Sequence, residues 1–185
     1  MRCHVLPVQD STVNFSFMEK PVIIKTLAAP ELFGSKIKAL LERTAARDLF
    51  DINNMITNNT ISGVELPILR KCVLFYKTVG STGPFKKDIR FDQIDELTFT
   101  NIRRTLLPVL RKSEHVDLPG MQKNVKSFVA DLLVLSEKEM QYLRDFSKGK
   151  YKPELLFEDP EILDRIKEHP MALWKVKQIR EDVAR

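Results

Sequence analysis

The hydrophobic pattern of this 185-residue chain changes its period near Ala29, and this change limits the folds open to it. Before Ala29, extended stretches are expected at residues 2–7, 13–17 and 22–24, where β-branched and aromatic residues gather or alternate with polar ones. After Ala29, apolar residues recur at helical spacing. The sequence therefore predicts a mainly α fold with a small N-terminal β part packed on the first helical hairpin.

Capping residues and prolines place the helix boundaries. Pro30 suits the first turn of a helix that runs to about Ala45, and a second helix should span Arg47 to about Thr57. Residues 80–84, a Gly-Ser-Thr-Gly-Pro run, form the clearest linker. We expect two domains, a β segment at 1–28 and a helical domain at 29–185, with a secondary boundary near 80–84. Further helices are expected at 64–79, 91–97, 98–112 with a kink at Pro108, 121–135 and 137–149, and from Pro160 and Pro170 onward.

Composition narrows the class of protein. No apolar run approaches the roughly 20 residues needed to span a bilayer, and the first ten residues do not read as a signal peptide. The two cysteines are too few for a disulfide scaffold, and Cys72 is expected to be a buried thiol. The three histidines lack the spacing of a metal site. We therefore expect a cytoplasmic protein without membrane contact. Trp174, beside Leu173 and close to Val176, is expected to pack in the core.

The excess positive charge is concentrated in the middle of the chain. Residues 70–112 hold ten Lys/Arg and four Asp/Glu, whereas the segments before and after them are close to neutral. Such a region attracts an anionic partner such as RNA, or it is a solvated helical surface. Four cations on one expected helix are the candidate RNA contacts: Arg103, Arg104, Arg111 and Lys112.

Charged residues in the first helical hairpin carry the clearest chemical signal. On the helix from Pro30, Glu31 falls on the solvated face, but Lys36 and Arg43 fall within the apolar arc. Cations aimed at a packed side need anionic partners. The second helix supplies carboxylates, so a cluster is expected that contains Lys36, Arg43, Arg47, Asp48 and Asp51. This cluster is either a structural ion-pair network or an anion site in which Lys36 binds a phosphate.

Residues 29–51, APELFGSKIKALLERTAARDLFD, resemble the signature of the AbiEii/AbiGii toxin family of nucleotidyltransferases. The resemblance lies in a Glu-Leu segment followed by Lys, Ala-Leu, Arg and a closing Arg-Asp-Leu-aromatic-Asp. The start, RCHVLP, and the segment HPMALWK at 169–175 are also similar to corresponding parts of such proteins. The resemblance thus extends over most of the chain, with a weakly patterned middle.

This resemblance implies a polymerase-β-like nucleotidyltransferase domain followed by a helical domain. It implies a toxin of a toxin–antitoxin or phage-defence pair that transfers nucleotides from an NTP, with Mg²⁺, to an acceptor such as tRNA. Lys36 and Asp51, with Asp48 nearby, match the catalytic positions of the family. Arg43 and Arg47 match neighbouring substrate-binding positions. An antitoxin protein and RNA are the implied partners.

The sequence departs from the family pattern in one respect. The family holds Mg²⁺ with an Asp-x-Asp pair after a Gly-Ser turn, and this chain has no Asp-x-Asp. Gly34-Ser35 is expected inside a helix and cannot form that turn. We therefore expect the C-terminal part of such an enzyme, with residues 1–28 as a β remnant of the catalytic domain and no activity alone. The alternatives are a non-catalytic helical interaction protein and an RNA-binding module.

Overall fold

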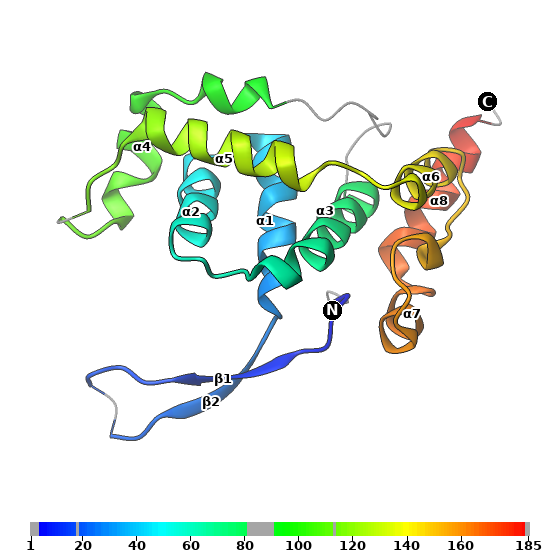
Figure 1. Ribbon diagram of the computed structural model, residues 1–185, viewed down its shortest axis with the longest axis horizontal. Coiled ribbons are helices and arrows are strands. Elements are labelled where there is room, and N and C mark those ends of the chain that lie inside the picture. Colours follow the sequence, from blue (N-terminus) through cyan, green and yellow to red (C-terminus); the bar gives the residue numbers. More distant parts are fainter. Residues whose placement is uncertain (1–3, 18, 81–90, 113, 184–185) are drawn as a thin grey trace.

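The chain folds into a two-stranded hairpin followed by a series of helices. The computed structural model describes residues 4–17, 19–80, 91–112 and 114–183. Within these residues the chain has eight α-helices and one antiparallel sheet. Figure 1 shows the helices forming one elongated body from which the hairpin projects. The predicted mainly α fold with a small N-terminal β part is confirmed. In this part of the chain, no helix is both long enough and apolar enough to cross a membrane.

The hairpin pairs β1 (Gln9–Val13) with β2 (Val22–Thr26) in the register Gln9↔Thr26 to Val13↔Val22. The strand expected at residues 13–17 is therefore wrong, because pairing with β2 ends at Val13 and the chain turns beyond it. Residues 4–7 of the expected first strand form no regular element either.

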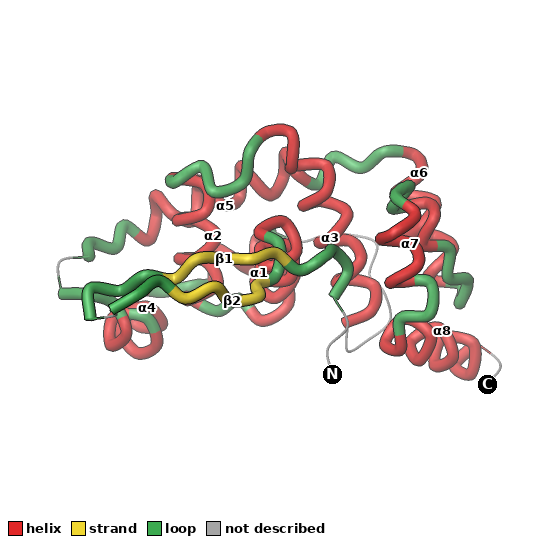
Figure 2. Tube along the Cα trace, turned by 90° about the horizontal axis from the view of Figure 1, so that it is seen from below, coloured by secondary structure: helices red, strands yellow, loops and turns green. Residues whose placement is uncertain are grey.

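The hairpin does not pack on the first helical hairpin, which corrects a second expectation. Ile23 is 70% exposed and Val22 and Ile24 are almost half exposed, so both faces of the ribbon meet solvent. Figure 1 shows the two strands below the helices and clear of them, and Figure 2, seen from below, shows them passing across α1 in that view. The physical reason is that each face mixes apolar with polar residues: Asp10 and Lys25 share one face with Ile23, and Ser11 shares the other with Ile24. Neither face can join an apolar core.

Glu31, in the first turn of α1 (Ala29–Arg43), fixes the base of this hairpin. Its carboxylate accepts hydrogen bonds from the backbone N–H of Val5 at 2.7 Å, the N–H of Leu6 at 2.8 Å and the hydroxyl of Tyr76. The side chain is fully buried, so its expected place on a solvated face is wrong. Three donors compensate the burial of the charge, and the positive end of the helix dipole adds to them.

Helix α1 and helix α2 (Ala46–Thr57) form an antiparallel pair joined by a very short turn. Thr44 adopts the left-handed conformation with φ 49°, and its N–H bonds to the carbonyl of Leu40. This left-handed residue ends α1 and reverses the chain within two residues. The predicted boundaries of both helices are confirmed to within two residues.

Helix α3 (Leu66–Gly80) contributes side chains to both apolar clusters of the described residues, and Figure 1 shows it in the middle of the helical body. Leu69 and Val73 pack with α1, α2 and α5, whereas Leu74 and Phe75 pack with the C-terminal helices. Gly34 brings α1 against α3, because a Cβ on Gly34 would lie only 2.7 Å from the Cβ of Cys72. The predicted burial of Cys72 is confirmed, and burial raises the pKa of its thiol. Residues 81–84 of the expected linker lie outside the described residues.

The expected helix at 98–112 is divided. Helix α4 (Phe99–Thr105) ends three residues before Pro108, and a 3₁₀ turn, η3 (Leu107–Val109), follows it. Proline has no N–H to donate and clashes with the preceding turn, so the helix stops instead of only bending. The short element at 91–97 is likewise a 3₁₀ helix, η2 (Asp92–Glu96).

The remaining helices follow the predicted order with small shifts. They are α5 (Leu118–Leu132), α6 (Glu137–Ser147), α7 (Pro160–Ile166) and α8 (Pro170–Val183), with short 3₁₀ turns η1 (Gly63–Glu65) and η4 (Pro153–Leu155) elsewhere. Trp174 on α8 is 52% exposed, so its expected place in the core is wrong. Ala172 and Val176 fill the buried side of α8, and Trp174 lies between them in sequence, roughly half a turn away.

Candidate functional site

The five charged residues of the expected cluster form two ion pairs and one separate contact. The pairs are Arg43–Asp48 and Lys36–Asp51. Arg47 instead donates from Nε to the carbonyl of Thr105 at 2.7 Å, which ties α2 to the end of α4. The sequence correctly indicated that α1 cations meet α2 carboxylates, but the expected single cluster is divided.

The Arg43–Asp48 pair lies beside the turn and is closed. Arg43 donates from Nε to Oδ2 of Asp48 at 2.8 Å and from its terminal nitrogen to Oδ1 at 2.9 Å. Asp48 has only 5% of its side chain exposed, and both of its oxygens are occupied by this one partner. The carboxylate raises the pKa of Arg43 by hydrogen bonding and charge attraction. This geometry favours the structural reading for this pair, since a bidentate contact fixes the two helices.

The Lys36–Asp51 pair lies two helical turns from Arg43 along α1 and is open. Lys36 Nζ is 2.5 Å from Oδ2 of Asp51, in a single contact. The two side chains are 30% and 40% exposed. Because this pair has a single hydrogen bond and is exposed to solvent, another anion can compete with Asp51 for the ammonium group of Lys36.

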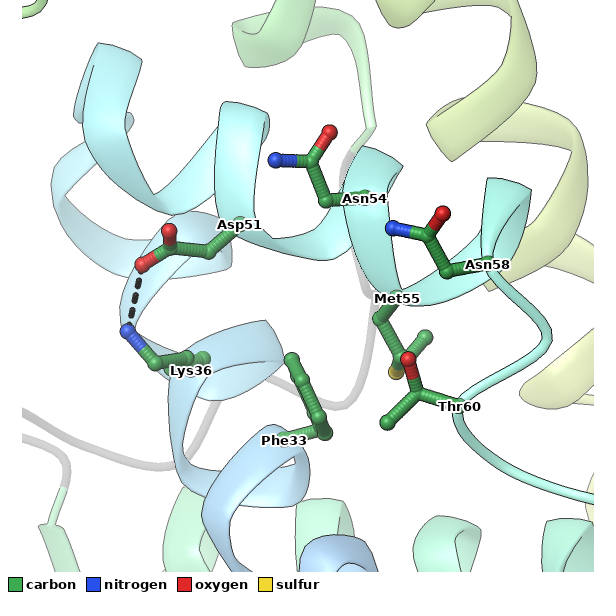
Figure 3. A pocket seen from close by; sticks show the side chains of 7 residues that line it. All are labelled: Phe33, Lys36, Asp51, Asn54, Met55, Asn58 and Thr60. Carbon is green, nitrogen blue, oxygen red and sulfur yellow. Dashed lines mark hydrogen bonds and ion pairs between the residues drawn. The ribbon is translucent and has the colours of Figure 1, made fainter. Parts of the chain in front are cut away.

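A pocket of about 250 Å³ opens beside this pair, between α1, α2 and the residues that follow α2 (Figure 3). Its lining combines an aromatic ring, a thioether, two side-chain amides and a hydroxyl with the ion pair. These residues are Phe33, Lys36, Asp51, Asn54, Met55, Asn58 and Thr60. An apolar floor with a few polar groups is typical of small-molecule sites.

The polar side of the pocket is a single stripe of α2. Asp51 and Asn54 of α2 and Asn58, which caps the C-terminal end of α2, are spaced by three and four residues, so they project from the same side (Figure 3). Neither Asn54 nor Asn58 has a side-chain hydrogen bond to another described residue. Asn53, on the other side of α2, accepts a hydrogen bond from Asn124 at 2.9 Å.

Phe33, Asn54, Asn58 and Thr60 were not singled out from the sequence. The signal that could have found the two asparagines is their spacing from Asp51, which places them on its side of the helix. Phe33 lies one turn before Lys36, but it reads as an ordinary core residue in the sequence.

The described residues do not fit Mg²⁺. Among them, no three His, Cys, Asp or Glu side chains converge on one point. Asp51 is the one carboxylate in the pocket lining, and it already holds the ammonium of Lys36. A hard cation needs several oxygen ligands, which this pocket does not offer.

The four candidate RNA-binding cations do not lie on one helix. Arg103 and Arg104 are on α4, whereas Arg111 and Lys112 follow η3. All four are exposed. None of them has an ion pair with another described residue. Their charge therefore faces solvent. In sequence they lie on either side of Thr105, whose carbonyl accepts the hydrogen bond from Arg47.

The chain belongs to the AbiEii family of nucleotidyltransferase toxins, because the family model described as "Nucleotidyl transferase AbiEii toxin, Type IV TA system" matches residues 1–148. An antitoxin partner is implied by this type of toxin. The match ends just after α6, so η4, α7 and α8 lie beyond it. No significant match was found among curated proteins or solved structures.

Proposed function

We propose that this chain supplies the Lys36–Asp51 part of a nucleotidyltransferase site that transfers a nucleotide from an NTP to an acceptor such as tRNA. The observation that supports this proposal is the contrast between the two ion pairs of one helical hairpin. Arg43–Asp48 is bidentate and its carboxylate is buried, whereas Lys36–Asp51 is monodentate and lines an open pocket.

Lys36 binds the triphosphate in this proposal. A triphosphate carries more negative charge than one carboxylate, so it draws the ammonium away from Asp51 without leaving Lys36 unpaired. Asp51 either keeps its contact with the lysine and orients it, or is released and accepts the proton of the acceptor hydroxyl as that oxygen bonds to the α-phosphorus and pyrophosphate leaves. Asp48 and Arg43 support this site indirectly. Arg43 on α1 donates two hydrogen bonds to Asp48 on α2, and this contact fixes the position of α2 and therefore of Asp51.

The carboxylates that hold Mg²⁺ come from another part of the enzyme or from a second polypeptide in this proposal. Mg²⁺ held by those carboxylates would offset the negative charge of the triphosphate. The chain has no Asp-x-Asp, and the lining of its pocket offers one carboxylate. The β hairpin is the proposed junction with that other part, since two strands alone are marginally stable in water and its apolar residues are exposed. We propose residues 1–28 as a portion of that catalytic domain and 29–185 as the helical domain.

The exposed cations of α4 and the segment after η3 are the proposed RNA contacts. Arg103, Arg104, Arg111 and Lys112 lie close in sequence to Thr105, which receives the hydrogen bond of Arg47 on the stripe of α2 that includes Asp51. An acceptor RNA held there by its phosphates is within reach of α2. Binding by these residues should weaken steeply with salt.

The test of the proposed function is a transfer assay with labelled NTPs, Mg²⁺ and a tRNA pool. The chain alone should transfer nothing, and the chain mixed with the polypeptide encoded immediately upstream of the Met1 codon should label tRNA. Lys36→Met in the mixture should abolish labelling. Lys126→Met is the matched control, because Lys126 on α5 also forms an exposed ion pair, with Asp95 of η2. Failure of the mixture to label tRNA, or full activity with Lys36→Met, would contradict the proposal.

The second candidate is a non-catalytic helical interaction protein within the same toxin–antitoxin setting. The closed Arg43–Asp48 pair and the absence of an Asp-x-Asp in the chain favour it. It predicts that the upstream polypeptide adds no transfer activity, and that Lys36→Met leaves binding of the antitoxin unchanged.

A further inference from the structure

The pocket extends past the Lys36–Asp51 pair to groups that a phosphate does not need. Asn54 on the last turn of α2 is half-buried, and Asn58, its C-cap residue, is exposed; both amides line the pocket (Figure 3). Phe33 and Met55 form the apolar part of the lining. This end of the pocket therefore suits a ligand with a flat apolar face and a polar edge.

Each asparagine amide offers an oxygen acceptor and a nitrogen donor. The edge of a nucleobase offers the same two kinds of group, and asparagine pairs with such edges by two hydrogen bonds. An aromatic ring and a thioether provide the surface against which the face of a base stacks. A nucleobase is thus a ligand chemistry that uses both amides and both apolar side chains at this end.

The size of the pocket agrees with a single base. About 250 Å³ lies below the ~300–1,000 Å³ typical of sites that enclose a drug-sized ligand. One ring system fits, while the sugar and phosphates would extend from the pocket. Lys36 lines the same pocket, so the phosphates of a seated nucleotide would meet its ammonium group.

We infer that Asn54 and Asn58 select the base of a nucleotide seated in this pocket, with Phe33 and Met55 against its face. The inference rests on the proposed function, because it places the base relative to Lys36. The base belongs either to the incoming NTP or to the terminal nucleotide of the acceptor RNA, and the recognition chemistry is the same for both.

Asn53 shows what a structural amide on this helix looks like. It is bonded to Asn124 across the contact with α5, whereas the amides of Asn54 and Asn58 bond to no other described residue. Replacement of Asn54 and Asn58 by alanine removes no side-chain hydrogen bond to another described residue, and at Asn54, within α2, alanine has the higher helix propensity. The variant should therefore fold as the original chain does.

The test measures the affinities of the four NTPs, the four nucleosides and inorganic tripolyphosphate by NMR titration at millimolar concentrations. The original chain should prefer one base by about tenfold over the weakest, the effect of one to two hydrogen bonds. Asn54→Ala combined with Asn58→Ala should reduce that preference to within about twofold and leave tripolyphosphate affinity unchanged. Asn53→Ala is the matched control and should keep the preference.

Equal affinity for all bases in the original chain, or a preference that survives the double replacement, overturns the inference. Loss of the preference in Asn53→Ala also overturns it, because the effect would then not belong to the pocket. No binding of any nucleotide or nucleoside overturns it as well. Short RNA oligonucleotides that differ only in their 3′-terminal base identify the source: sensitivity to that base, lost in the double variant, assigns the pocket to the acceptor, and insensitivity assigns it to the NTP.

Lys36→Met separates this inference from the proposed function. If tripolyphosphate binds Lys36→Met as well as the original chain, the proposed role of Lys36 is wrong. The preference among nucleosides, which carry no phosphate, still tests Asn54 and Asn58 in that case. If instead Lys36→Met loses tripolyphosphate while the double asparagine variant keeps its base preference, the proposed function stands and the inference is overturned.

Discussion

The two sides of α1 are built in opposite ways. Toward α3, Gly34 brings the backbone of α1 against Cys72, which is fully buried. Toward α2, Phe33 and Lys36 border a pocket, and Lys36 is 30% exposed. One helix thus has a side held by close backbone contact with α3 and a side whose edge toward α2 leaves space for a ligand.

The same contrast recurs along the α1–α2 contact itself. Beside the turn at Thr44, the Arg43–Asp48 pair closes the gap with two hydrogen bonds. Farther from the turn, Lys36 and Asp51 share one hydrogen bond at the edge of open space. An ion pair between helices therefore does not by itself indicate stability or function; its exposure and the occupancy of its oxygens decide.

The largest effect on stability is expected from Gly34→Ala, on the side of α1 that packs against α3. The added Cβ would lie 2.7 Å from the Cβ of Cys72 and 3.2 Å from backbone atoms of α3, so the helices must separate. Overpacking of this kind should lower the free energy of unfolding by about 2–3 kcal/mol in urea denaturation. Ser35→Ala, on the next residue, is the control and should change it by less than about 0.5 kcal/mol. Equal stabilities would show that the α1–α3 contact is softer than its geometry indicates.

An intermediate and asymmetric effect is expected at the closed ion pair. Arg43→Met leaves the buried Asp48 carboxylate without a partner and should cost about 2 kcal/mol of unfolding free energy. Asp48→Asn leaves an arginine that is already 66% exposed, and should cost about 1 kcal/mol. Thermal denaturation of the two variants side by side measures the difference. A larger loss of unfolding free energy for Asp48→Asn than for Arg43→Met would contradict the argument that Asp48 is the partner that is costly to leave unpaired.

The smallest effect on stability is expected at the open pair. Lys36→Met should change the unfolding free energy by no more than about 0.5 kcal/mol, because the pair is monodentate and wetted. The same variant should bind tripolyphosphate at least about tenfold more weakly. Asp51→Asn should instead strengthen tripolyphosphate binding, since it removes the competing carboxylate. A loss of stability equal to that of Arg43→Met would make the two pairs equivalent.

The helical part of the fold could be predicted from sequence because capping residues and hydrophobic spacing are local signals. Pro30 and the spacing of the apolar residues located α1 and α2 well. The helical wheel also placed Lys36 and Arg43 toward carboxylates of α2. The division into an open and a closed pair was not predictable, because it depends on the left-handed turn at Thr44 and on packing around Asp48.

Features that depend on partners distant in sequence were missed. Glu31 reads as a solvated first-turn residue, but its donors are the N–H groups of Val5 and Leu6, about 25 residues earlier. The exposure of Trp174 was missed for a related reason. Its apolar character indicated burial, whereas α8 buries the side that holds Ala172 and Val176.

The carboxylate of Glu31 has a consequence for hydrogen exchange. The amides of Val5 and Leu6 lie outside any helix or strand, yet both are bonded to a buried acceptor and both side chains are buried. They should therefore exchange with deuterium far more slowly than the amides of the turn at residues 14–17, which belong to no ladder. The hairpin is thus a ribbon with a protected base and an unprotected tip, and any partner that covers the tip should be visible as new protection there.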